Sequence, residues 1–128
     1  AACKAMLSEG VISHGLVSRD NVRNLLYQSD ALVLASRSEV QPLALLEAMS
    51  TGIPVVATEC VPQSLRIADG CTIVPVDDVQ ALSDAMRQVM EQKDFDGVSV
   101  SASVRQLASP EVIGRRLTTL FNELLVSA

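Results

Sequence analysis

The sequence predicts an α/β fold in which a parallel sheet is flanked by helices. Short apolar runs alternate with segments of helical periodicity, and this alternation is typical of parallel strands joined by crossover helices. The run at 31–35 is apolar throughout, as expected for a strand buried on both faces. Hydrophobic residues make up 48% of the chain and aromatic residues only 2%, so the core is expected to be aliphatic.

We expect the elements in the order β-α-β-α-β-α-β-α-α. Ser18 is suited to cap the helix that follows the first strand, and Pro42 and Gly52 are suited to begin and end the next helix. Asp77 or Asp78 is expected to cap a long helix. The expected strands are 11–14, 31–35, 55–57 and 72–76, the end of a helix is expected at 2–8, a short helix at 62–68, a loop or weak helix at 94–104, and a final amphipathic helix at about 110–126.

Length and composition limit the class of protein. A chain of 128 residues suffices for one domain, and we predict a single partial Rossmann-like domain over 1–128 with its core at 11–93. The net charge of -5 argues against nucleic acid or an anionic membrane as the main partner. No apolar run reaches the roughly 18 residues of a membrane span. Three cysteines without a C-x-x-C pair favour a reducing, cytoplasmic setting.

Candidate site residues gather after the second expected strand. In open α/β sheets, ligands bind at the carboxyl ends of the strands. Ser36, Ser38 and Glu39 follow the strand at 31–35, and Glu47 falls about one turn inside the next helix. A carboxylate accepts two hydrogen bonds side by side, which suits a ribose diol. The free N–H groups at 41–43 are suited to a diphosphate, although Pro42 lacks one of them.

Each of these residues also has a simpler interpretation. Glu47 alone could belong to a solvated helix face, and Glu39 alone is an ordinary loop acid. His14 has no acid partner nearby in sequence, so we interpret it as structural. Arg19, Arg23 and Arg37 are interpreted as exposed surface charges rather than phosphate ligands.

The motif around the two glutamates resembles that of a known family. Glu39 and Glu47 are separated by seven residues, and Glu47 begins an Ala-Met-Ser, Gly, Pro-Val-Val-Ala continuation at 48–57. The chain over 11–126 is similar to the carboxyl-terminal nucleotide-sugar-binding domain of retaining GT-B glycosyltransferases of the family 4 type. The segments that carry the resemblance further are 29–36, 73–78 and 109–125.

The resemblance implies roles for these residues. Glu47 would hold the ribose of a nucleotide-sugar, and Glu39 would contact the hydroxyls of the donor sugar at the catalytic centre. Ser38 would also contribute to the donor site. The backbone at Gln41, Pro42 and Leu43 would approach the sugar and phosphates, and Val17 would lie near the base. The donor is a substrate, and neither a metal nor another cofactor is expected.

The sequence departs from the family pattern in ways that affect the expected site. Val40, Gln41 and Pro42 stand where the family usually has glycine with small or aromatic residues, and 59–63 lacks the two glycines and the acid of a later turn. The family's Arg/Lys phosphate loop and its amino-terminal acceptor domain have no counterpart here. Because the chain also opens in mid-pattern without a methionine, we expect a part of a longer enzyme that is inactive alone.

The same resemblance predicts an incomplete sheet. The strand at 11–14 would be the third of a six-stranded order 3-2-1-4-5-6, and the first two strands would be missing. We therefore expect that segment to pair elsewhere or with another copy, and the interrupted sheet favours a homo-oligomer. Two alternative functions stay open, a nucleotide-sugar epimerase of GT-B fold and a non-catalytic α/β binding module.

Overall fold

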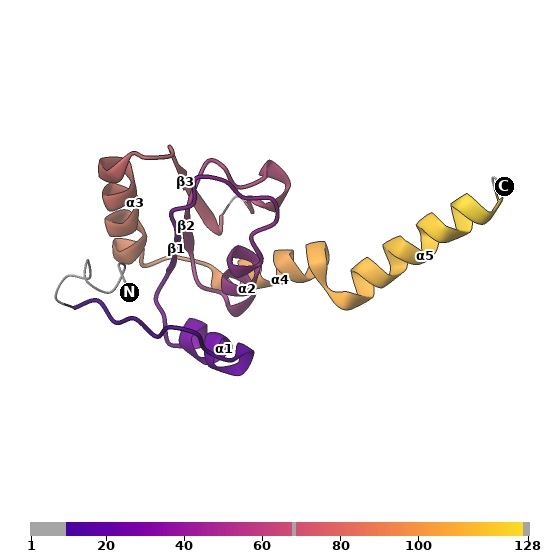
Figure 1. Cartoon of the computed structure of the whole chain (residues 1–128), viewed down its shortest axis with the longest axis horizontal. Coiled ribbons are helices and arrows are strands. Elements are labelled where there is room, and N and C mark those ends of the chain that lie inside the picture. Colours follow the sequence, from indigo (N-terminus) through magenta and orange to yellow (C-terminus); the bar gives the residue numbers. More distant parts are fainter. Residues whose placement is uncertain (1–9, 68, 127–128) are drawn as a thin grey trace.

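A computed structural model describes residues 10–67 and 69–126 and shows an α/β fold (Figure 1). Its parallel sheet has the order β1-β2-β3, with Leu32 opposite Val55 and Val55 opposite Cys71. The strands are β1 (Leu32–Leu34), β2 (Val55–Thr58) and β3 (Cys71–Val74). The helix end expected at 2–8 lies outside the described residues.

Helices cover both faces of the sheet. Figure 1 shows α3 on one side and α2 with α4 on the other, while α5 projects away from the sheet. The helices are α1 (Arg19–Tyr27), α2 (Leu43–Thr51), α3 (Val79–Glu91), α4 (Gly97–Ala108) and α5 (Pro110–Val126), with a 3-10 turn, η2, at Gln63–Leu65.

Local sequence signals explain where these helices begin and end. The Ser18 hydroxyl accepts a hydrogen bond from the N–H of Asn21, and the Asp78 carboxylate accepts one from the N–H of Ala81. Each satisfies a backbone donor that the helix leaves unpaired. Gly52 ends α2 in the left-handed conformation, with φ 85°, which glycine adopts without steric penalty. These three predictions are confirmed.

The core has two parts because successive residues of β2 point to opposite faces of the sheet. Val55 and Ala57 belong to the part formed with α2 and α4, where Met49 and Val100 are buried. Val56 belongs to the part formed with α3, together with Val74, Ala85 and Val89. All four residues of β2 are buried, which the central position of this strand explains.

The expected strand at 11–14 is wrong. These residues have no strand structure, and the side chains of Val11 and Ile12 are 51% and 77% exposed. A strand needs a neighbour for its backbone hydrogen bonds, and β1 to β3 pair only among themselves within the described residues.

The weak helix or loop expected at 94–104 is instead a regular helix, α4, capped by Asp96. Its side chains Val100 and Val104 are buried against α2, beyond residue 93 where the predicted core ended.

Candidate functional site

Polar groups join the carboxyl ends of β1 and β2. The Thr58 hydroxyl donates a hydrogen bond of 2.5 Å to the carbonyl of Ser36, and the Cys60 thiol donates one of 3.3 Å to the same oxygen. Thr58 is only 4% exposed, so this bond satisfies a hydroxyl that would otherwise be buried without a partner. The turn after β1 is therefore anchored to the strand beside it.

The segment after β2 is held by Arg66. Its guanidinium donates to the carbonyl of Val61 at 2.9 Å and to that of Glu59 at 2.5 Å. The Glu59 carboxylate in turn accepts a weak hydrogen bond of 3.4 Å from the N–H of Val76 after β3. The segment after β2, which lacks glycine at 59–63, is therefore an arginine-bound loop.

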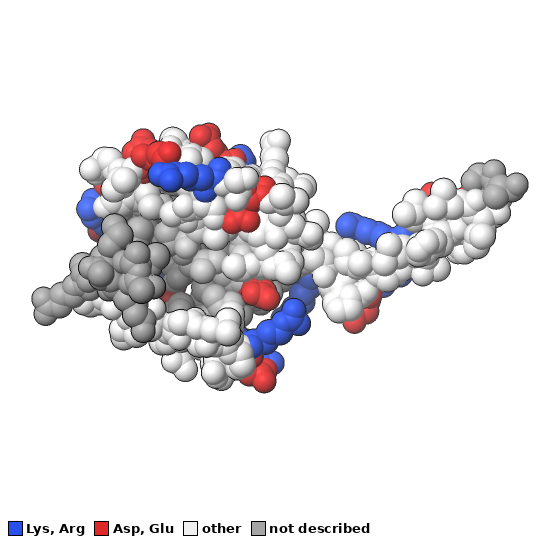
Figure 2. Space-filling view, in the orientation of Figure 1, with Lys and Arg blue, Asp and Glu red and all other residues white. Residues whose placement is uncertain are grey.

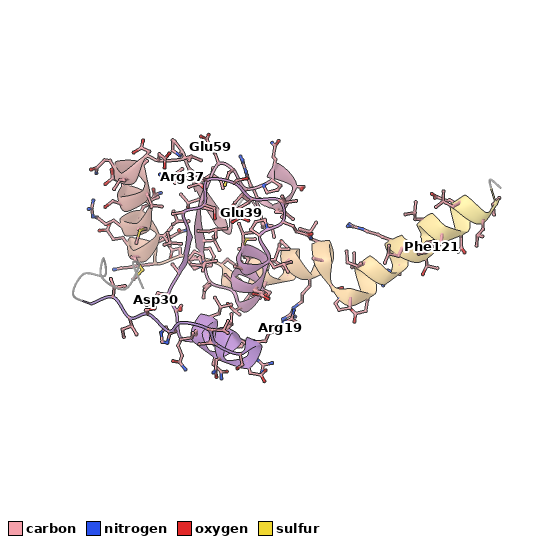
Figure 3. The ribbon with its side chains drawn as sticks, in the orientation of Figure 1. Arg19, Asp30, Arg37, Glu39, Glu59 and Phe121 are labelled. Atoms are coloured by element: carbon pink, nitrogen blue, oxygen red, sulfur yellow. The ribbon has the colours of Figure 1, made fainter. Side chains whose placement is uncertain are left out.

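Arg37 and Asp77 connect the segments after β1 and β3. The Arg37 Nε donates to Asp77 Oδ1 over 2.7 Å, and both side chains remain largely exposed. Asp77 has a φ of 62°, in the left-handed region that residues with a Cβ seldom occupy. Figure 3 shows Arg37, Glu39 and Glu59 at one end of the sheet, with Arg19 near α1 at the other.

Glu39 lies on this edge and is half-buried. Its Oε1 accepts a hydrogen bond of 2.5 Å from the Ser36 hydroxyl, three residues earlier. Ser38 is exposed beside it, and so is Val40, whose side chain is 90% exposed. The carboxylate thus has a fixed orientation and retains further acceptor positions.

The start of α2 offers backbone donors. Pro42 is the N-cap residue and provides no side-chain cap, and its carbonyl accepts a hydrogen bond of 3.2 Å from the N–H of Leu45. Among the described residues, no partner accepts from the N–H groups of Leu43 and Ala44. Gln41 is exposed, as is Leu43, while Pro42 is buried. Free N–H groups at a helix start attract anions.

Glu47 is exposed in the middle of α2. It lines a cavity of about 380 Å³ between α1 and α2, together with Arg19, Arg23 and Ser50. Arg23 makes a long ion pair with Asp20, at 3.8 Å. The two arginines were interpreted as surface charges; they are exposed, but they also share a cavity with Glu47. Their spacing of four residues, which places both on one helix face, was the signal for this arrangement.

The structure places the predicted site residues in four separate surroundings, one of which is the start of α2 with Gln41, Pro42 and Leu43. Ser38 and Glu39 lie at the carboxyl edge of the sheet, and Glu47 lies in the cavity beside α1. Val17 lines neither of these; it is half-buried beside a cavity of about 180 Å³ with His14 and Leu25.

The described part of the chain contains no group of three or more His, Cys, Asp or Glu side chains arranged to hold a metal ion. None of its helices combines the length and the apolar character required to cross a membrane.

Comparison of the sequence with models of known families identifies a family to which the chain is similar. Residues 1–92 match the family model described as glycosyl transferases group 1. The chain belongs to this family. The match includes the segment from β1 through the end of α3, so it contains Ser36, Glu39 and Glu47.

Individual proteins are also similar to this member of the family. The chain is 29% identical over 115 residues to the N-acetyl-alpha-D-glucosaminyl L-malate synthase of Bacillus anthracis, covering 86% of this chain and 30% of that protein. It is 31% identical over 105 residues to WcaC of Escherichia coli (strain K12), whose name assigns it provisionally to glycosyl transfer in colanic acid biosynthesis; this covers 80% and 20%. The chain therefore spans 20% to 30% of the length of these relatives.

A third relative is named for a specific donor. The UDP-Gal:alpha-D-GlcNAc-diphosphoundecaprenol alpha-1,3-galactosyltransferase of Escherichia coli is 32% identical over 78 residues, which cover 59% of this chain and 20% of that protein.

Proposed function

We propose that this chain forms the donor-binding part of a glycosyltransferase that takes a sugar from a nucleotide-sugar and transfers it with retention of configuration. The observation that carries the proposal is the placement of Glu47, an exposed carboxylate that lines a cavity of about 380 Å³. Membership of the group 1 glycosyl transferases supports the reaction class.

The distance between Glu47 and the start of α2 suits the ribose and the diphosphate of one nucleotide. With a rise of 1.5 Å per residue, Glu47 lies roughly 6 Å along the helix axis from Leu43. In the proposal, the N–H groups of Leu43 and Ala44 bind the diphosphate, and the Glu47 carboxylate accepts hydrogen bonds from the ribose diol. The positive end of the helix replaces a metal ion as the partner of the leaving diphosphate.

Glu39 is assigned to the sugar end of the donor. Its hydrogen bond from Ser36 leaves the second carboxylate oxygen available for a sugar hydroxyl. Because this contact is fixed before the donor arrives, little rotational freedom is lost when the sugar binds.

The remaining parts of the reaction are assigned to the rest of a longer enzyme. The named relatives are three to five times longer than the matched region, which leaves room for an acceptor domain and for a cationic phosphate loop. The 128-residue chain is accordingly expected to bind a donor weakly and to transfer no sugar by itself.

Calorimetry and thermal unfolding of the chain with UDP-glucose, GDP-mannose and ADP-glucose test the proposal. A donor that binds the folded state raises the midpoint of thermal unfolding. Glu47→Gln should remove this shift, because an amide N–H group then faces the ribose hydroxyls. Glu91→Gln, an equivalent change at the exposed end of α3, should keep it. Equal shifts in the two variants would refute the role of Glu47.

A further inference from the structure

One ion pair crosses the carboxyl edge of the sheet. Arg37 follows β1 and Asp77 follows β3, and β2 lies between these strands in the order β1-β2-β3. Neighbouring strands lie about 5 Å apart, so the two segments are separated by roughly 10 Å, and the Arg37 side chain covers much of this distance. Figure 3 labels Arg37 at this end of the sheet, and Figure 2, in the same orientation, shows basic and acidic side chains gathered there.

A small cavity shows what lies beneath the pair. It has a volume of about 130 Å³, and its lining includes Arg37 and Asp77 together with Thr58, the last residue of β2. Thr58 is also the residue whose hydroxyl donates to the Ser36 carbonyl at 2.5 Å. The Arg37–Asp77 pair is therefore a strap, a contact that runs over the end of β2 and joins the segments on either side of it.

The segment that carries Glu39 has few other attachments. Within the described chain, no backbone group of residues 37–41 makes a hydrogen bond. The side chain of Val40 is 90% exposed and that of Arg37 80%, so packing holds this segment weakly. Two side-chain contacts hold it, the hydrogen bond from Ser36 to Glu39 and the strap. The first is local, because it joins residues three apart, whereas the strap ties the segment to the end of β3.

The backbone of Asp77 is a second, independent observation. Its φ of 62° lies in the left-handed region, where a residue with a Cβ is strained and glycine is not. An exposed ion pair adds little to the stability of a fold, so the contact with Arg37 does not explain the strain as a gain in stability. Strained backbone of this kind clusters at binding sites and active sites.

We propose that the strap positions Glu39 for the sugar of the donor, with Arg37 and Asp77 as positioning residues that act through this carboxylate. The inference rests on the proposed function, in which Glu39 binds a sugar hydroxyl. With the strap closed, the turn is held from β2 through the Ser36 carbonyl and from β3 through Asp77. With the strap open, residues 37–41 gain conformational freedom, which they must lose again when the sugar binds.

Substitutions at Asp77 separate the strap from the stability of the fold. Asp77→Gly removes the acceptor but relieves the backbone, so the midpoint of its urea unfolding should stay close to that of the original chain. Asp77→Asn keeps an acceptor oxygen for Arg37, and asparagine tolerates the left-handed conformation. Glycine should therefore open the strap without unfolding the chain, and asparagine should keep it closed.

Calorimetry measures the effect on the sugar end of the site. Binding of UDP-glucose, GDP-mannose and ADP-glucose is compared with that of UDP, GDP and ADP. For a donor that binds, the affinity relative to its nucleoside diphosphate should fall about threefold to tenfold in Asp77→Gly and in Arg37→Met, which lacks the guanidinium. Asp77→Asn should stay within about twofold of the original chain. Arg87→Met should not change the ratio; it is the matched control, because Arg87 forms an exposed ion pair with Asp84 in α3.

Nitrogen-15 relaxation of the ligand-free chain tests the strap without a donor. The order parameters of the N–H groups at 38–40 should fall from about 0.85 toward about 0.6 in Asp77→Gly and stay high in Asp77→Asn. Unchanged order parameters in Asp77→Gly, or a donor-to-diphosphate ratio that is the same in the two variants, would overturn the inference alone.

Failure of the proposed function would look different. In that case none of the three donors binds the original chain, or Glu47→Gln binds them as well as Glu91→Gln does. The role of the strap at a donor site is then overturned as well, whatever the order parameters show.

Discussion

The hydroxyl of Ser36 donates a hydrogen bond of 2.5 Å to Glu39 Oε1 and ties this carboxylate to the end of β1. The carbonyl of Ser36 is itself held by Thr58 and Cys60. The orientation of Glu39 thus depends on β2 as well as on its own turn. A change at Ser36 should therefore act on the site through Glu39.

Replacing Ser36 by alanine should weaken binding of the sugar part of a donor. The loss of one hydrogen bond that positions Glu39 is worth about 1 kcal/mol, or a roughly fivefold change in affinity. Calorimetry should show weaker binding of UDP-glucose and unchanged binding of UDP, because only the sugar contacts Glu39 in the proposal. Ser83→Ala, at an exposed position of α3, should leave both affinities unchanged, and an equal loss for UDP and UDP-glucose would contradict the assignment.

Asp77 should respond to substitution through its backbone more than through its charge. Asp77→Ala places a Cβ-bearing residue without a polar side chain at a φ of 62° and should lower the unfolding free energy by about 1 kcal/mol. Asp77→Gly also removes the ion pair with Arg37 but relieves the left-handed backbone, so its stability should change by less than about 0.5 kcal/mol.

Urea unfolding measures both variants. Asp84→Ala is the matched control, because Asp84 also forms an exposed ion pair, with Arg87, but lies in a regular helix. If Asp77→Gly were as destabilised as Asp77→Ala, the ion pair rather than the backbone would be decisive.

Gly97 allows α4 to begin directly beside the end of α2. A Cβ at position 97 would overlap the carbonyl oxygen of Gly52, and a backbone atom cannot move aside as a flexible side chain can. Gly97→Ala should therefore lower the unfolding free energy by about 2 kcal/mol. Gly114→Ala makes the same change where nothing lies within 4 Å and should not destabilise the chain. Equal unfolding free energies for Gly97→Ala and Gly114→Ala would show that α2 and α4 can move apart at little cost.

Cys71 should make stability depend on pH in the alkaline range. Burial raises the pKa of its thiol from 9.0 to about 11, and the positive charge of Arg66 lowers it only in part. The folded chain keeps this proton to a higher pH than the unfolded chain does. Between pH 9 and 11 the unfolded state binds fewer protons, so this contribution to the unfolding free energy is lost as pH rises.

Urea unfolding across this interval should show a shallower decline for Cys71→Ala than for the original chain. The substitution removes the thiol and its titration, while groups elsewhere in the chain still titrate equally in both proteins. Parallel declines in the two proteins would show that the Cys71 thiol does not contribute.

The strands of the sheet could be predicted because each is an apolar run and its neighbours along the chain are its neighbours in space. The run at 11–14 has two β-branched apolar residues, Val11 and Ile12, as expected of a short strand, yet a strand also needs a partner, which a single segment does not reveal. The helix α4 was not predicted as a regular helix, because small and polar residues make up most of its sequence. Val100 and Val104, four residues apart, were the signal for a buried helix face.

The candidate site could likewise be predicted only in part. The motif located Glu39 and Glu47, but it gave no indication that Ser36 would bind Glu39 or that Arg19 would line the cavity beside Glu47. These relations depend on side-chain rotamers and on how α1 packs against α2, which the pattern of a single segment does not determine.

The sheet order β1-β2-β3 also affects how the chain can fold during synthesis. Each strand pairs with the strand made just before it, so the sheet can grow outward without waiting for a distant segment. α4 is different, because it packs against α2 from about fifty residues further along the chain. Until Val100 and Val104 emerge, the apolar side chains around Met49 stay open to water, and this is the surface that a chaperone would meet on the nascent chain.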